Sequence, residues 1–116
     1  MQYLLLIYGA EKLWEKYTEP EKQTIYKEYR ELIQDLQKKG NFLGGNELQP
    51  ISMATTVRVR DGKKSVTDGP FAETKEQLGG YFLVEAKDLD EAMAMAERIP
   101  SATSGAIEVR PVKINS

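Results

Sequence analysis

The chain contains 116 residues, of which 41% are hydrophobic and 29% charged, and its formal net charge is −2. This length suits a single domain over residues 1–116, which buries enough surface to fold without a disulfide or a metal. The chain has no cysteine and no histidine, which excludes thiol nucleophiles, cysteine-ligated metals and the usual general base near neutral pH. We therefore expect no metal and no cofactor, and the slightly acidic balance argues against a nucleic-acid partner.

The first apolar run covers residues 3–8 and is closed by Gly9. It is far shorter than the roughly 20 residues that span a membrane, and no basic leader precedes it. We expect a cytoplasmic protein without a membrane partner. The run itself predicts a strand that is buried on both faces. Residues 10–17, which include Trp14, are expected to form a loop or a ragged turn.

Two helices are predicted from their capping residues and apolar spacing. Thr18, Pro20 and Glu21 form a helix start with a capping box, and Gly40 ends that helix. The apolar stripe between them consists of Ile25, Tyr29, Leu32, Ile33 and Leu36. Asp88 begins the second helix, and Pro100 ends it. The side chains expected to point inward from the second helix are Leu89, Ala92, Met93, Ala96 and Ile99.

The remaining segments read as strands. Residues 41–50 predict a strand that is bulged at its glycines, and residues 55–60 alternate as a strand with one apolar face. The Asp61-Gly62 turn returns the chain into residues 64–67, and further strands are expected at residues 81–84 and 107–110. The order β-α-β-hairpin-β-α-β predicts the α+β class, as a ferredoxin-like βαββαβ sandwich with an antiparallel sheet.

Two helices can cover only one face of such a sheet. The strands expected at its centre, residues 3–8 and 81–84, are apolar at odd and even positions alike. The outer strands place Arg58, Arg60, Glu108 and Arg110 opposite their apolar side chains. The helix-free face would then be apolar at its centre and charged toward its edges, as interfaces are. We therefore expect a homodimer through this face. Solvation of strand ends explains the arginines equally well.

The segment Asp68-Gly69-Pro70-Phe71 is the most unusual short stretch of the chain. An Asp in a turn usually accepts from the N–H two residues on, but Pro70 has no N–H. Asp68 therefore needs the Phe71 N–H, a side chain or a ligand. The charged stretch that follows has a simpler interpretation as a solvated loop. Gly79 and Gly80, just before a buried strand, suggest a bulge or the close approach of another backbone or a ligand.

Residues 54–58 and 66–81, with Val66-Thr67-Asp68-Gly69-Pro70-Phe71-Ala72-Glu73-Thr74-Lys75-Glu76-Gln77 at their centre, resemble the DGPF branch of the YCII-related domain family. Residues 3–8, 43–48 and 108–112 also match, so the resemblance covers essentially the whole chain. It implies a dimeric α/β barrel of two ferredoxin-like sheets packed face to face. The histidine–aspartate pair proposed for the wider family cannot exist here, since the chain has no histidine. Members similar to this chain are often encoded beside sigma factors of the extracytoplasmic-function type, which implies an association with a sigma factor.

Two classes of function remain open besides a purely structural role. The first is a small-molecule-binding or regulatory domain with a small polar ligand or a protein partner. The alternative is a small-molecule enzyme in which Asp68 or Glu73 acts as acid or base, while Lys75 or Arg58 stabilises charge. Burial raises the pKa of a carboxyl group and pairing with an ammonium group lowers it, and the sequence does not decide between them. The remaining candidate ligand-binding residues are Glu73, Thr74, Gly44, Gly45 and Gly80.

Overall fold

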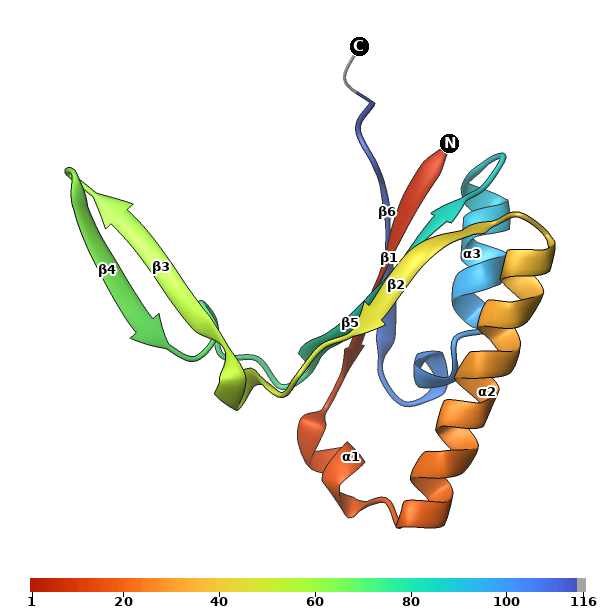
Figure 1. Ribbon diagram of the computed structural model, residues 1–116, viewed down its shortest axis with the longest axis horizontal. Coiled ribbons are helices and arrows are strands. Elements are labelled where there is room, and N and C mark those ends of the chain that lie inside the picture. Colours follow the sequence, from red (N-terminus) through yellow and green to blue (C-terminus); the bar gives the residue numbers. More distant parts are fainter. Residues whose placement is uncertain (115–116) are drawn as a thin grey trace.

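A computed structural model describes residues 1–114 and has one four-stranded antiparallel sheet with its main helices on one side (Figure 1). The helices and strands are β1 (Gln2–Gly9), α1 (Glu11–Lys16), α2 (Glu19–Lys38), β2 (Phe42–Glu47), β3 (Thr55–Arg60), β4 (Lys63–Asp68), β5 (Gln77–Glu85), α3 (Leu89–Glu97) and β6 (Ala106–Pro111). Two 3-10 turns within residues 1–114 are η1 (Ile51–Met53) and η2 (Pro100–Thr103). The strand order β2-β5-β1-β6 agrees with a ferredoxin-like α+β fold.

The core lies between the sheet and helices α2 and α3. Because successive side chains of a strand point to opposite faces, Tyr3, Leu5 and Ile7 of β1 point into this core, while Leu4 and Leu6 point away from it. The other buried apolar side chains are Leu32, Leu36, Phe82, Val84, Ala86, Ala92, Met95, Ala96 and Ile99. No helix within residues 1–114 is both long enough and apolar enough to cross a membrane.

The predicted helix boundaries are confirmed by their caps. The Thr18 side chain accepts from the Glu21 N–H at 3.3 Å, and the Glu21 carboxylate accepts from the Thr18 N–H at 2.8 Å. These two bonds complete the capping box at the start of α2. Gly40 follows this helix with a φ of +78°, a conformation that favours glycine. At the start of α3, Asp88 accepts from the Glu91 N–H at 2.9 Å.

Two local predictions about helices are wrong. The segment expected to be a loop contains α1, which begins after Ala10 without a side-chain cap and depends on contacts with distant segments. Leu89 and Met93 were expected to point inward, but they are 48% and 42% exposed. In α3 the buried stripe runs through Ala92, Met95 and Ala96, and the other two side chains flank it.

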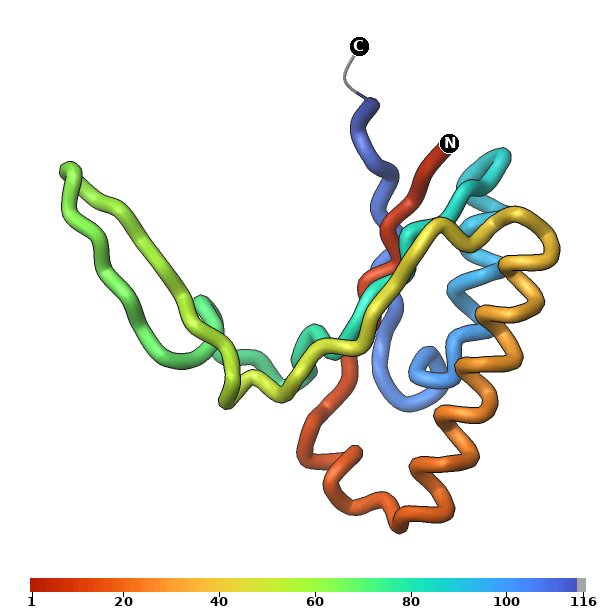
Figure 2. The backbone as a smooth tube through the Cα atoms, viewed as in Figure 1, coloured from red at the N-terminus to blue at the C-terminus, as the bar shows by residue number. Residues whose placement is uncertain are grey.

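The β3–β4 hairpin forms a separate two-stranded sheet. The prediction placed residues 55–60 as an outer strand of the main sheet, but β2 takes that edge position by pairing with β5. Asp61 and Gly62, with φ values of 52° and 74°, make the predicted tight turn. Figures 1 and 2 show that the hairpin extends from the sheet on the side opposite to α2 and α3. Arg58 and Arg60 therefore lie on this hairpin instead of at the edge of the main sheet.

The helix-free face of the main sheet, which we call the open face, is apolar at its centre. Leu4 pairs with Leu83, and Leu6 pairs with Tyr81, so four large side chains lie together on this face. At the β6 edge, Glu108 and Arg110 lie opposite Leu6 and Leu4. The Arg110 Nε donates to the Glu108 carboxylate at 2.7 Å. The expected charged edge is therefore present on β6.

Candidate ligand-binding cleft

A cleft of about 860 Å³ lies at one end of the sheet, on the side of the helices. Its walls come from α1, α2 and η2 and from the ends of β1, β2 and β5. Helix α1 lies beside the N-terminal half of α2 at this end of the fold (Figure 1). Four consecutive elements, from β1 to β2, therefore meet β5 and η2 from later in the chain around one concave site, which is typical of a binding site for a small molecule.

One wall of the cleft is aromatic. The ring centroid of Trp14 lies 5.8 Å from that of Tyr17 and 5.4 Å from that of Tyr26, both edge to face. Deeper in the cleft, Tyr29 packs edge to face on Phe82 at 6.2 Å. Such pairs fix the orientation of the rings and leave apolar surface for a ligand.

Two tyrosine hydroxyls supply the polar groups of this wall. The Tyr26 hydroxyl donates to the Glu47 Oε1 at 3.1 Å, and the Tyr29 hydroxyl shares a 2.7 Å hydrogen bond with the Ser101 Oγ. Burial raises the pKa of Tyr26 above 10, and the nearby Glu47 carboxylate raises it further. Burial also raises the pKa of Tyr29. Both hydroxyls are therefore protonated at neutral pH and can act as hydrogen-bond donors or acceptors.

Glu11 ties the cleft to the base of the hairpin. Its carboxylate Oε2 accepts from the Ile51 N–H at 2.9 Å, and its own N–H donates to the Gln77 Oε1 at 2.9 Å. The Gln77 Nε2 donates in turn to the Thr74 backbone oxygen at 2.6 Å. These bonds hold α1 against the two segments that lead into and out of the hairpin. They give the short helix its position despite its lack of a cap.

The structure brings two of the predicted site residues into the cleft, namely Gly45 and Gly80. The neighbouring Gly44 pairs with Leu83 on the open face. The acidic candidate Asp68 is exposed at the end of β4 and pairs with Thr55. In a single chain, the predicted site residues of the hairpin and of the connection after it do not line the cleft with the aromatic wall. These residues are Arg58, Asp68, Glu73, Thr74 and Lys75.

The Asp68-Gly69-Pro70-Phe71 turn is held by its backbone instead of by a carboxylate contact. Gly69 has a φ of +99°, its N–H donates to the Ala54 oxygen at 2.7 Å, and its oxygen accepts from the Thr56 hydroxyl at 2.8 Å. Among residues 1–114, no hydrogen bond to the Asp68 carboxylate is formed. This carboxylate is therefore free to meet solvent or another molecule.

The sequence interpretation missed the aromatic wall. Trp14 lay in a segment expected to be a loop, and Tyr29 was assigned to the core stripe of the helix. The signal that was available is the spacing of Tyr26 and Tyr29, three residues apart on one helix face. Tyrosines in such a position combine an apolar body with a polar tip.

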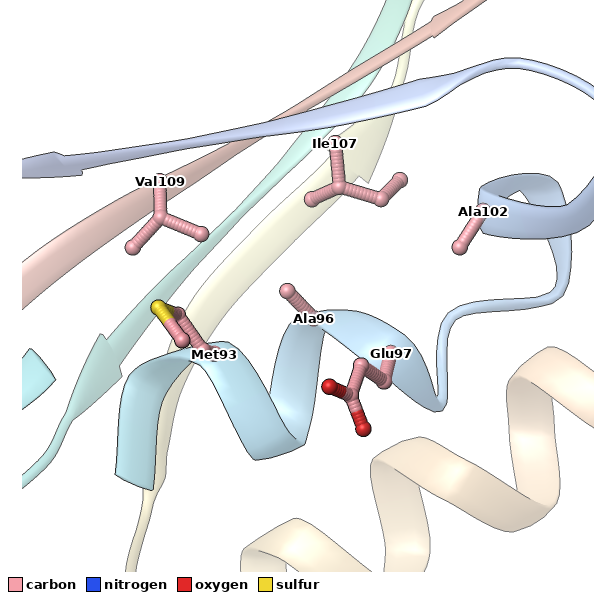
Figure 3. Close-up of a pocket in the computed structure, with 6 residues that line it drawn as sticks. All are labelled: Met93, Ala96, Glu97, Ala102, Ile107 and Val109. Carbon is pink, nitrogen blue, oxygen red and sulfur yellow. The ribbon is translucent and has the colours of Figure 1, made fainter. Parts of the chain in front are cut away.

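A second hollow of about 250 Å³ lies between α3 and β6 (Figure 3). Ile107 and Val109 point from the strand toward Ala96 and Met93 on the helix. Its lining is apolar apart from Glu97. Because a binding site needs several convergent polar groups, this hollow is a weaker candidate than the cleft.

Comparison with known proteins places this arrangement in a family. The model of the YCII-related domain matches residues 1–114. An uncharacterized protein of Rhizobium meliloti (strain 1021) is similar to the chain, with 33% identity over 116 residues that cover 98% of this chain and 94% of the relative. Both matches extend over the cleft, the open face and the hairpin together. The chain therefore belongs to the YCII-related domain family.

Proposed function

We propose that the protein is a small-molecule-binding domain and that the cleft is its binding site. The observation that carries this proposal is the aromatic wall with its protonated tyrosine hydroxyls, which offers apolar contact area and directional hydrogen bonds together. The lining also contains the carboxylates of Glu11, Glu28 and Glu47 and the guanidinium of Arg30, and the Lys22 ammonium lies 5.5 Å from the Trp14 ring centroid. A ligand with an aromatic body and a protonated amine fits this charge balance.

The proposal can be tested with the fluorescence of Trp14, which is the only tryptophan of the chain and lies in the wall of the cleft. Benzylamine and benzoate at millimolar concentration are suitable probes, because they share a ring and differ in charge. We expect a saturable change of emission with benzylamine and a weaker one with benzoate. Tyr26→Phe should weaken binding, whereas Tyr8→Phe, which changes a residue outside the cleft lining, should not. Emission that changes with neither probe would reject the cleft as a site for such ligands.

We also propose that the protein is a homodimer through the open face, as a dimeric α/β barrel. The apolar centre of this face and its charged β6 edge support the proposal, because monomers seldom expose a large side-chain cluster of this kind. Light scattering should give about twice the 13.1 kDa of one chain. Leu6→Glu should produce a monomer, whereas Leu89→Glu, which changes an exposed side chain at the start of α3, should not. A folded parent chain that stays monomeric at micromolar concentration would contradict the proposal.

The enzymatic alternative, in which Asp68 serves as acid or base with Lys75 or Arg58, stays a proposal, as does the association with a sigma factor. The enzymatic alternative depends on the hairpin and the connection after it. A single chain keeps these residues outside the cleft, so catalysis there needs them to be supplied by another molecule. The assignment of the chain to the DGPF branch likewise stays a proposal.

A further inference from the structure

The β3–β4 hairpin carries an apolar face that the rest of the chain leaves uncovered. Val57 and Val66 form a cross-strand pair, and Val59 lies two residues further along the same face. These three side chains are 57%, 56% and 60% exposed, respectively. An isolated two-stranded hairpin is only marginally stable in water, and it gains stability when one face packs on something. This valine face therefore needs a covering surface.

The hairpin, which we call the arm, extends from the rest of the chain, which we call the body, on the same side as the open face. Its base is fixed to the turn after β4, because the Gly69 N–H donates to the Ala54 oxygen at 2.7 Å. The two connections begin at β2 and end at β5, which are strands of the open face. Figure 1 shows the hairpin extending away from that side of the sheet, opposite to the helices. The half-buried apolar cluster of the open face and the arm with its exposed valines thus lie on the same side of the sheet.

The charge of the hairpin indicates what kind of surface covers it. Over residues 55–68 the hairpin has four basic and two acidic side chains, which gives a net charge of +2. The whole chain has a net charge of −2, so the rest of the chain carries −4. A body of this same sequence is therefore electrostatically complementary to the arm. Its own body does not cover the arm, and the body of a second copy carries the complementary charge.

We propose that the β3–β4 hairpin is a clasp that packs its valine face on the second copy of the chain in the homodimer. This inference rests on the homodimer proposed above and adds a second contact region to it. Under two-fold symmetry each copy gives one arm and receives one, so both valine faces are covered by the same operation. The predicted site residues Arg58 and Asp68 belong to this arm and would accompany it to the partner.

Single cysteines provide the first test, since the chain has none of its own. Val57→Cys places a thiol on the valine face, and Ser65→Cys places one on the opposite face of the same hairpin. Both are labelled with a maleimide at concentrations where light scattering reports a dimer and after dilution to monomer. We expect the thiol at position 57 to react about tenfold more slowly than the thiol at position 65 in the dimer only. Equal rates in a proven dimer would overturn the clasp and leave the dimer standing. A chain that is monomeric at every concentration would overturn both.

The second test measures the contribution of the clasp to assembly. The combined variant Val57→Thr, Val59→Thr and Val66→Thr keeps residues that favour strands and removes apolar surface from both arms. We expect the dimer dissociation constant to rise on the order of a hundredfold. The control variant Ser65→Thr with Thr67→Ser changes only the opposite face and should leave the constant unchanged. A triple variant that dimerises as tightly as the parent would refute the clasp.

Discussion

The neighbouring glycines of β2 offer a matched pair of substitutions, because a methyl group would meet protein at one position and open space at the other. A Cβ on Gly45 would lie 2.6 Å from the Tyr81 backbone oxygen, 3.0 Å from the Phe82 Cδ1 and 3.2 Å from the Phe42 Cζ. A Cβ on Gly44 would meet nothing within 4 Å. Both glycines were predicted as ligand-binding residues from the sequence, but only one is required for packing.

The expected changes in the free energy of unfolding depend on which atoms the added methyl group would displace. The Tyr81 oxygen belongs to the backbone of β5, so Gly45→Ala forces the two strands apart. Overpacking of this kind costs about 1–3 kcal/mol, which corresponds to a fall of roughly 4–12 °C in Tm for a domain of this size. Gly44→Ala meets no atom and restricts the unfolded chain, so it should stabilise the protein by about 0.4–1 kcal/mol.

Urea unfolding, followed by circular dichroism and Trp14 emission, measures both effects. Two protein concentrations are needed so that any change in assembly is separated from a change within the subunit. The expected result is a lower midpoint for Gly45→Ala and an equal or higher midpoint for Gly44→Ala. If Gly45→Ala is as stable as the parent, or if both variants lose the same stability, the close approach of β2 to β5 described above is wrong.

Further predictions concern charge and close packing. The ion pair with Arg98 at 2.7 Å lowers the pKa of Asp35 below its usual 3.8. The stability that this carboxylate contributes is present above that value and is lost as the pH falls through the lowered pKa. Asp35→Asn should therefore lower the urea midpoint at pH 7 but much less at pH 3, and an equal loss at both would contradict this. Gly105→Ala should destabilise more than Gly45→Ala, since its Cβ would clash more closely with backbone, at the Tyr8 oxygen of β1. Calorimetry that finds it neutral would refute that contact. Asp68→Asn should change the free energy of unfolding by less than about 0.5 kcal/mol, because the carboxylate is exposed. A larger loss in urea titrations would assign it a role in folding. Ligand binding should be flat between pH 6 and 8, because the chain has no histidine and the pKa of Tyr26 is raised. A change in ligand affinity between pH 6 and 8, measured by Trp14 emission, would contradict this.

Elements whose signals are local could be predicted from the sequence. The capping box of Thr18 and Glu21, the positive φ of Gly40 and the Asp61-Gly62 turn each involve neighbouring residues only. The continuous apolar run of β1 likewise predicted a central strand with apolar side chains on both faces. The family resemblance agrees with these elements over nearly the whole chain.

The cleft could not be predicted in this way, because its parts meet only after folding. Trp14, Tyr26 and Glu47 come from three elements, and Ser101 joins them from the far end of the chain. Helix α1 was missed for the same reason, since bonds from Glu11 to distant segments hold it. The hairpin was expected in the main sheet, because its apolar alternation is the same whether a strand packs on its own domain or on another molecule.

The position of Glu11 makes the cleft and the hairpin base mechanically dependent on each other. One carboxylate and one backbone N–H of this residue fasten α1 to Ile51 before the hairpin and to Gln77 after it. A ligand that shifts α1 therefore strains the root of the arm, and an arm that is fixed in place restrains α1. Coupling of this kind is reciprocal by thermodynamic necessity. If a cleft ligand changes the equilibrium constant for docking of the arm by a given factor, docking of the arm changes the affinity for the ligand by the same factor.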